Sequence, residues 1–169
     1  MTVEYVNRKD ERYTLYEGRT KTGKPKYYCS RKPSSSGIPA EAMPTGYEWR
    51  ENPADGIVSV RKRPSTRIAA GEREVLVEAI GTQAGLKTFI ADIDGDSLVA
   101  YIPDRNPEAV GELFEGMFAL GSAGAASMMD WTIKHVHYSP MMRFVLHDDR
   151  ERLFVVERWC YLGSIDRWI

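Results

Sequence analysis

The chain has 169 residues, of which 43% are hydrophobic and 28% are charged, and its formal net charge is −1. This composition is ordinary for a soluble globular protein, and the length suits one domain or one domain with a small appendage. No run approaches the roughly 18 apolar residues of a membrane span, and the first residues lack the apolar core of a signal peptide. We therefore expect a cytoplasmic protein, and its two distant cysteines exclude a disulfide framework or a CxxC site.

The small net charge conceals two oppositely charged halves. Residues 1–67 hold 14 Lys and Arg against 8 Asp and Glu, a net charge of +6, whereas residues 68–169 hold 9 against 16, a net charge of −7. Such asymmetry can indicate an anionic partner for the basic half. Attraction between the halves, or solvation of the charges, is the simpler explanation.

The first predicted element is a β-hairpin at Tyr13–Ser30. Thr20–Lys24 supplies its turn, and Pro25 suits the start of an edge strand. The Pro- and Ser-rich segment Lys32–Gly37 is predicted to be a loop, and Ile38–Pro44 is compatible with one short helical turn.

A second hairpin is predicted from Gly46–Glu51 and Ile57–Arg63, because the loop between them has Pro and Gly where a turn requires them. The two hairpins indicate a basic, β-rich part at residues 1–64, followed by an α+β part at residues 65–169. A single domain is the alternative.

Two helices and a third hairpin follow. Glu72–Ile80 is predicted to be a short helix, and Lys87–Ile102 a hairpin in which Ile93 pairs with Leu98. Pro107–Phe118 has the clearest helical pattern, with Asn106 as its N-cap and apolar residues recurring every three to four positions. That apolar stripe is expected to pack on a sheet. Gly121–Ser127 is interpreted as a loop or a closely packed segment.

The stretch Trp131–Tyr161 is the richest in β-prone residues, and two turn signals divide it, at Ser139–Pro140 and Asp149–Arg150. Two tight turns predict a three-stranded antiparallel meander, with strands at Trp131–His137, Met142–Asp148 and Arg152–Trp159. This register gives one apolar face, made of Trp131, Ile133, Phe144, Leu146, Leu153 and Val155. Leu146 should then be buried between Ile133 and Leu153.

One acidic motif suggests catalysis. Phe89–Leu98, FIADIDGDSL, resembles the nucleophile motif of haloacid-dehalogenase phosphatases, an apolar strand followed by Asp-x-Asp-Gly-Thr. The resemblance implies that Asp92 is the nucleophile, that Asp94 is the general acid and base, and that both lie near Mg²⁺. It also assigns Asp148–Asp149 to the metal motif and Lys134 to the family's lysine.

Three features of the sequence oppose a phosphatase. Asp96 stands where the motif has Thr, and the segment between Asp92 and Asp148 is too short for the several βα crossovers of that family. Strand-like residues also follow the motif at once, which favours a hairpin. The same residues do not fit a calcium loop, because Gly and Glu are absent from its sixth and twelfth positions.

Histidine and cysteine residues offer further candidates. His135 and His137 would share one strand face, as a metal pair can, but His147 falls on the opposite face, so we expect partly buried strand histidines and no metal site. Cys29 lies near several cations, which lower a thiol pKa. No catalytic partner can be assigned to it, and a small strand residue is the preferred interpretation.

The basic first hairpin is the best candidate for binding. Residues 8–32 hold nine Lys and Arg against three Asp and Glu, with tyrosines interleaved. Cations for phosphates and aromatic rings for bases are typical of a nucleic-acid surface, and also of a Lys-rich hairpin that protects an exposed edge. The predicted nucleic-acid-binding residues are Lys21, Lys24, Lys26, Tyr27, Tyr28 and Arg31.

Three segments, KTGKPKYYCSRKP, MPTGYEWRENPADGIVSVRK and FVVERWCYLGSIDRWI, resemble segments of uncharacterised prokaryotic proteins. The resemblance implies a soluble bacterial or archaeal protein and assigns no catalytic residue.

The sequence therefore predicts an α+β fold of antiparallel β-hairpins, a C-terminal meander and two principal helices. The leading functional hypothesis is a binding module without enzymatic activity or cofactor that contacts nucleic acid through the first hairpin. A protein-interaction or regulatory subunit is the alternative, and an Mg²⁺-dependent phosphoryl-transfer enzyme at Asp92 and Asp94 is the third.

Overall fold

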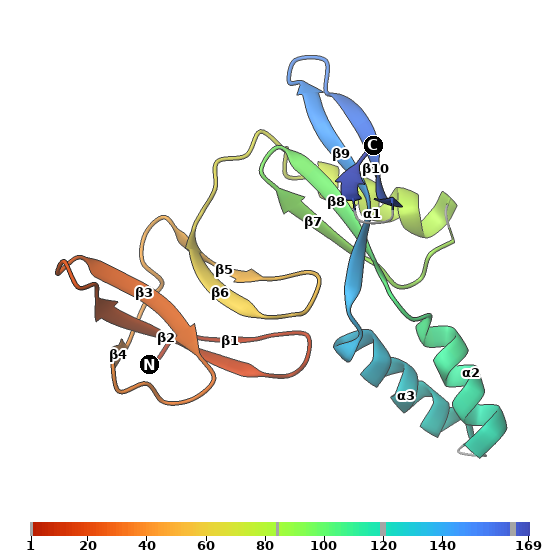
Figure 1. Cartoon of the computed structure of the whole chain (residues 1–169), viewed down its shortest axis with the longest axis horizontal. Helices are drawn as coiled ribbons and strands as arrows, with labels where there is room; N and C mark the ends of the chain where they lie inside the picture. Colours follow the sequence, from red (N-terminus) through yellow and green to blue (C-terminus); the bar gives the residue numbers. More distant parts are fainter. Residues whose placement is uncertain (1, 84, 119–120, 163–164) are drawn as a thin grey trace. The chain divides into compact units, whose positions relative to one another are not determined.

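The structure of the chain is a computed structural model that describes residues 2–83, 85–118, 121–162 and 165–169. The chain divides into two compact units, Met1–Pro64 and Ser65–Ile169, here called unit 1 and unit 2. Helices and antiparallel strands occur together, as Figure 1 shows, so the predicted α+β class is confirmed.

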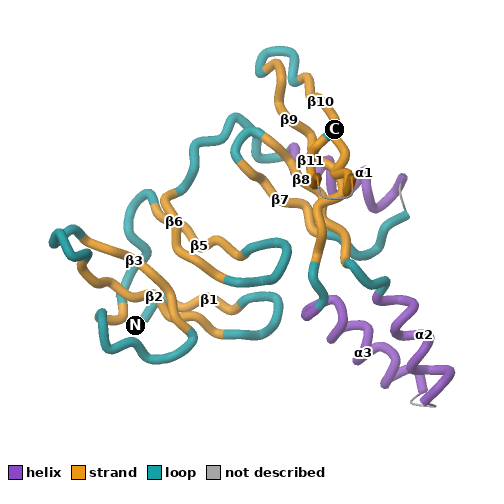
Figure 2. The backbone as a smooth tube through the Cα atoms, viewed as in Figure 1, coloured by secondary structure: helices purple, strands orange, loops and turns teal. Residues whose placement is uncertain are grey.

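Unit 1 is built of strands, with no helix in its described residues (Figure 2). Its strands are β1 (Glu4–Val6), β2 (Arg12–Arg19), β3 (Pro25–Ser30), β4 (Ile38–Pro39), β5 (Tyr47–Glu51) and β6 (Val58–Lys62). β2 pairs with β1, β3 and β4, while β5 and β6 form a separate hairpin. Both predicted hairpins of this region are confirmed.

The predicted helical turn at Ile38–Pro44 is wrong, because the segment begins as β4. The Ala40 amide donates to the Leu15 carbonyl at 2.9 Å, and the Ala40 carbonyl accepts from Val3 at 3.0 Å. Because the amide and the carbonyl of Ala40 are both hydrogen-bonded to neighbouring segments, its backbone does not need the hydrogen bonds of a helical turn. Leu15 itself is fully buried and anchors the core of unit 1.

In its described residues, unit 2 is a five-stranded antiparallel sheet with three helices. Its elements are α1 (Glu72–Gln83), β7 (Ile90–Asp94), β8 (Ser97–Pro103), α2 (Pro107–Phe118), α3 (Gly121–His135), β9 (Tyr138–Asp148), β10 (Leu153–Leu162) and β11 (Ile165–Trp168). The strand order is β11-β10-β9-β8-β7, so each strand pairs with its neighbour in the sequence.

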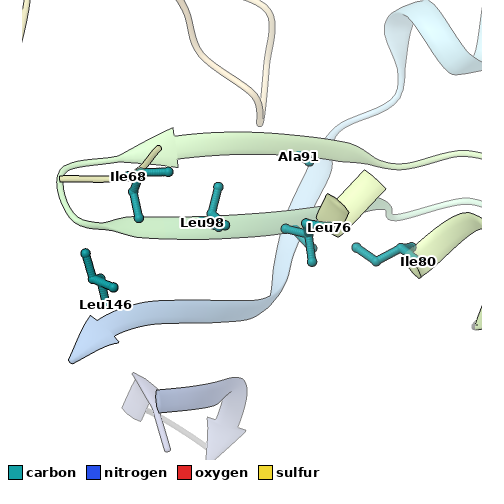
Figure 3. Close-up of a cluster of buried hydrophobic side chains, with 7 residues drawn as sticks. Ile68, Leu76, Ile80, Ala91, Leu98 and Leu146 are labelled. Carbon is teal, nitrogen blue, oxygen red and sulfur yellow. The ribbon is translucent and has the colours of Figure 1, made fainter. Parts of the chain in front are cut away.

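The core of unit 2 lies where α1 meets one face of this sheet (Figure 3). Its buried residues are Ile68, Leu76, Ile80, Ala91, Leu98, Ala100 and Leu146. The predicted register of the β7–β8 hairpin is confirmed, because Ile93 pairs with Leu98 across a turn in which Gly95 has a positive φ of 58°. This pairing places Ala91, Ile93, Leu98 and Ala100 on the sheet face that packs against α1.

The start of the predicted meander is wrong, because Trp131–His135 is the end of helix α3 and β9 begins only at Tyr138. The proposed loop at Gly121–Ser127 is the first half of the same helix. Thr132 donates its hydroxyl to the Met128 carbonyl four residues earlier, which is a helical contact. Ser139 and Pro140 do not form a turn but lie inside β9, beside an irregularity in its pairing with β8, where a strand tolerates proline.

Helix α3 packs against α2, and this contact explains why the β-prone residues Trp131–His135 form a helix and not the predicted strand. Gly111 of α2 is buried, and a Cβ built on it would lie 3.4 Å from the carbonyl oxygen of Ala125, so small residues let the helices approach closely.

Helix α2 has its predicted bounds, and Asn106 Oδ1 accepts the Glu108 amide at 3.0 Å as the expected N-cap. Its apolar stripe was expected to face a sheet, but α2 contacts α3 instead, and Leu113 is exposed.

The β9–β10 hairpin is present, but its predicted register is wrong by one residue. Leu146 is buried as expected, yet it pairs with Phe154, while Leu153 is 55% exposed. The turn is longer than predicted: Asp148 accepts the amides of Arg150 and Glu151, and Arg152 has a φ of 52°. The register shifts between Leu153 and Phe154, and from Phe154 onward the two strands pair residue by residue. Ile133, the other expected neighbour of Leu146, lies on α3.

An ion-pair network joins the start of α1 to two turns of the sheet. Arg152 donates two hydrogen bonds to Glu72, at 2.8 and 2.6 Å, and also pairs with Asp149. Arg67, in the segment before α1, pairs with Asp96 through both its backbone amide and its guanidinium, at 2.8 Å each. Asp96, which occupies the Thr position of the phosphatase motif, therefore holds Arg67 in place.

Within the residues that the structure describes, no helix is long and apolar enough to cross a membrane.

Candidate nucleic-acid interface

The β2–β3 hairpin presents its cations from a well-defined turn. The Thr20 amide donates to the Lys24 carbonyl at 2.9 Å, the Lys24 amide donates to Thr20 Oγ1 at 3.1 Å, and Gly23 has a φ of 80° that glycine adopts without strain. The side chains of Lys21 and Lys24 project from this turn and are exposed. The turn thus holds two positive charges in solvent at one end of unit 1.

Side chains alternate along β3, which separates the predicted binding residues onto two faces. Lys26 and Tyr28 lie on one face, and Tyr27 and Cys29 lie on the other. Lys26 Nζ is 5.5 Å from the centre of the Tyr28 ring, which is within the range of a cation–π contact. Of the predicted binding residues on β3, Lys26 and Tyr28 therefore share a face, and Tyr27 lies on the opposite one.

Tyr27 and Cys29 face the β5–β6 hairpin of the same unit. The Tyr27 ring meets the Tyr47 ring edge-on, with 5.1 Å between centroids, and the Cys29 thiol donates to the Val58 carbonyl at 3.2 Å. Burial raises the pKa of the Cys29 thiol, which outweighs the influence expected from the nearby cations. Cys29 is a small strand residue, as the preferred interpretation proposed.

Tyr28 is fixed on the opposite face by three side chains. Its ring stacks on Tyr16, with 5.6 Å between centroids and 19° between planes. Its hydroxyl lies 2.7 Å from Ser34 Oγ and 3.0 Å from Ser36 Oγ, both from the loop that follows β3. Hydrogen bonds from Ser34 and Ser36, together with the charge of Lys26, lower the pKa of the Tyr28 phenol. The site therefore favours negative charge at the phenol oxygen.

Two arginines of this region, Arg12 and Arg31, form ion pairs. Arg31 forms an ion pair with Glu11 and lies over the Tyr13 ring, with Cζ 5.9 Å from the ring centre. Partial burial acts to raise the pKa of Glu11, but a hydrogen bond from Asn7 and the charge of Arg31 lower it overall. Arg31 was predicted to bind nucleic acid, yet its charge is already compensated within unit 1.

Five cations of the β2–β3 hairpin and of the loop that follows it have no such compensation. Within the described part of the chain, no carboxylate forms an ion pair with Arg19, Lys21, Lys24, Lys26 or Lys32. We call these five residues the hairpin cations. All five are exposed, and they come from one hairpin and the loop that follows it.

Comparison of the chain with protein-family models, curated proteins and solved structures finds no match.

The acidic motif of unit 2 forms no comparable site. Asp92 and Asp94 lie on β7 of an antiparallel sheet, whereas the phosphatase family requires a parallel one. Lys134 lies on α3 and pairs with Asp130 at 3.2 Å. Asp148 accepts amides of its own turn. Lys134 and Asp148 therefore each make a separate local contact, Lys134 with Asp130 and Asp148 with the amides of its own turn.

The histidines also differ from the prediction of partly buried strand residues. His135 ends α3 and stacks on Trp131, with 4.7 Å between ring centroids, while His137 lies between α3 and β9 and contacts Asp104 Oδ2 at 3.0 Å. Both side chains are exposed, because the helix replaces the predicted strand. Over the described ranges, no group of three or more His, Cys, Asp or Glu side chains is placed to hold a metal ion.

Sequence reasoning missed the two serines that contact Tyr28. The segment Lys32–Gly37 was interpreted only as a loop, and its three consecutive serines were the available signal. Their position beside Tyr28 depends on the close packing of Gly37 against β2, which no local pattern reveals: a Cβ at Gly37 would lie 2.7 Å from the Glu17 carbonyl oxygen.

Proposed function

We propose that this protein binds nucleic acid by contacting backbone phosphates with the hairpin cations. The supporting observation is that these five cations lack carboxylate partners in the described residues, whereas Arg12 and Arg31 of the same region are paired. Lysine and arginine side chains that neutralise phosphates release condensed counterions, which drives binding without reading the base sequence. The expected activity is binding of low sequence preference that weakens strongly with salt.

The aromatic residues favour phosphate contacts over base stacking. The Tyr27 ring is engaged by Tyr47, and one face of the Tyr28 ring is engaged by Tyr16. Base stacking requires an aromatic ring with an open face, so we expect base stacking on the two tyrosines to contribute less than the phosphate contacts of the cations. At low salt, duplex nucleic acid should then bind at least as tightly as a single strand of equal length, because its higher charge density releases more counterions per contact.

A triple-Gln variant, with Lys21→Gln, Lys24→Gln and Lys26→Gln, tests this proposal. Fluorescence anisotropy with short labelled RNA and DNA at about 50 mM salt should show that the variant binds at least tenfold more weakly than the wild type. A matched control removes three exposed cations of unit 2, at Lys87, Arg105 and Arg150.

The control changes the net charge of the protein by the same amount but leaves the hairpin intact. Equal weakening by the two variants would mean that only total charge matters, and no measurable binding by the wild type would reject the proposal. The acidic composition of unit 2 is the main opposing factor, because it lowers the overall attraction to polyanions.

Interaction with another protein is a second candidate function. Leu153, Val155 and Val156 on β10 are 55%, 46% and 54% exposed, which places large aliphatic side chains in solvent on both faces of the strand. A protein partner would cover such a surface. If the wild type binds no nucleic acid, sedimentation of the wild type and of a Val155→Ser variant tests whether this surface mediates self-association.

A further inference from the structure

Three hydroxyl groups meet beside the basic strand β3. Tyr28 Oη is 2.7 Å from Ser34 Oγ and 3.0 Å from Ser36 Oγ, and the two serine oxygens are 3.1 Å apart. The three oxygens therefore form a closed triangle in which every pair is within hydrogen-bonding distance. Two sides of the triangle, both involving Ser36, are exposed to solvent.

The triangle is held in place by further contacts of the residues that form it. Stacking on Tyr16 fixes the Tyr28 ring. A Cβ on Gly37 would lie 2.6 Å from Tyr28 Oη and 2.7 Å from the Glu17 carbonyl oxygen, so only glycine lets the loop approach this closely. The Ser36 amide also donates to Ser34 Oγ at 3.3 Å. The hydroxyls are thus positioned before any ligand arrives.

This arrangement suits an oxyanion. Each hydroxyl carries one proton that rotates freely between acceptors, so three donors can turn from each other toward an oxygen of a bound anion. Lys26 lies on the same face of β3 and adds a positive charge near the ring of Tyr28. The lowered pKa of Tyr28 supports this view, because the groups that stabilise a phenolate also stabilise an external oxyanion at the same place.

We propose that Tyr28, Ser34 and Ser36, together with Lys26, form a subsite for one phosphate group. The identity of its ligand as a backbone phosphodiester rests on the proposed function, whereas the chemistry of the subsite would also accept free phosphate. The hydroxyls orient the phosphate oxygens, and Lys26 compensates the charge. The remaining hairpin cations would contact neighbouring phosphates.

Neighbouring residues supply matched variants. Tyr28→Phe removes one hydroxyl but keeps the ring, and Tyr27→Phe makes the same change on the opposite face of the strand. Ser34→Ala and Ser35→Ala form a second pair, because no side-chain hydrogen bond of Ser35 occurs in the described residues. We expect Tyr28→Phe and Ser34→Ala to weaken binding to a short single-stranded oligonucleotide about tenfold, and the two controls to change it less than twofold.

A second measurement separates ligand binding from a structural role for the loop. Two-dimensional NMR of the wild type during titration with inorganic phosphate should show saturable shifts of the Ser34–Gly37 amides, with sodium chloride at matched ionic strength causing no such shifts. Tyr28→Phe should abolish the phosphate shifts. Affinity lost in Tyr28→Phe without phosphate shifts in the wild type would mean that Tyr28 only holds the loop, and would overturn the subsite.

The two proposals fail in different ways. If the triple-Gln variant loses binding but Tyr28→Phe and Ser34→Ala bind as the wild type does, the subsite is wrong and the proposed function stands. If no oligonucleotide binds but inorganic phosphate shifts the Ser34–Gly37 amides, the subsite stands as a site for free phosphate and the proposed function is wrong. If neither ligand gives a signal, both are wrong.

Discussion

Truncation of one leucine in the β9–β10 hairpin tests the register of the unit 2 sheet. Leu146 is 3% exposed and belongs to the cluster that includes Ile68 and Leu98, so Leu146→Ala removes a fully buried side chain. Such truncations cost about 2–5 kcal/mol of unfolding free energy, from lost burial and from the cavity left behind. For a unit of this size, 2 kcal/mol corresponds to a decrease in Tm of roughly 8 °C or more.

Leu153 provides the matched control, because it carries the same side chain on the next strand but is 55% exposed. Leu153→Ala should change the unfolding free energy by no more than about 0.5 kcal/mol. Urea unfolding followed by tryptophan fluorescence is a suitable assay, since three of the four tryptophans lie in unit 2. Equal costs at the two positions would refute the observed register and support the one in which Leu146 faces Leu153.

Three further predictions concern titration and chemistry. Cys29 should react with thiol reagents at pH 8 more slowly than an unstructured cysteine peptide, because burial raises its pKa; faster reaction would contradict its burial. The hydrogen bonds from Arg152 lower the pKa of Glu72 in the folded state, so its contribution to stability is complete above the unfolded pKa of about 4.3 and is lost as the pH falls through the folded value. Glu72→Gln should therefore reduce the dependence of the unfolding free energy on pH below about pH 4.3, and an unchanged dependence would show that the pair is not formed. Finally, the protein should not hydrolyse generic phosphate esters with Mg²⁺, and turnover that Asp92→Asn abolishes in a folded variant would overturn that expectation.

Elements with a strong local signal could be predicted from the sequence. Asn106 and Pro107 mark the start of α2 because a side-chain cap and a fixed φ act within one helical turn. The β7–β8 register followed from a short turn at Gly95 and from apolar residues at alternating positions. In both cases the determining interactions connect residues close in sequence.

Elements that depend on distant contacts could not be predicted in this way. Trp131–His135 has a strand-like composition, but packing of α3 on α2 outweighs this preference. The position of Leu153 depends on the positive φ of Arg152, which β-branched or bulky residues rarely adopt and which no turn rule predicted here. A shift of one residue in that turn moves Leu153 from the expected core to the surface.

The candidate site likewise combines features that the sequence predicts with features that depend on distant contacts. The positive charge of the β2–β3 hairpin is evident from composition, and the placement of Tyr27 and Tyr28 on opposite faces follows from strand alternation. The compensation of Arg31 by Glu11 and the contact of Ser34 with Tyr28 arise from tertiary structure. The interface that we propose therefore consists of the five hairpin cations and the hydroxyls of Tyr28, Ser34 and Ser36, whereas six residues were predicted from the sequence.

The most direct test of phosphate binding by the hairpin is the salt dependence of affinity, measured between about 50 and 200 mM salt for the wild type and the triple-Gln variant. Each lost phosphate contact should reduce the slope of log affinity against log salt by about 0.9 on duplex DNA and about 0.7 on single strands. We predict that the slope of the variant is smaller than that of the wild type by roughly two to three units. Equal slopes for the two proteins would contradict phosphate contacts at Lys21, Lys24 and Lys26.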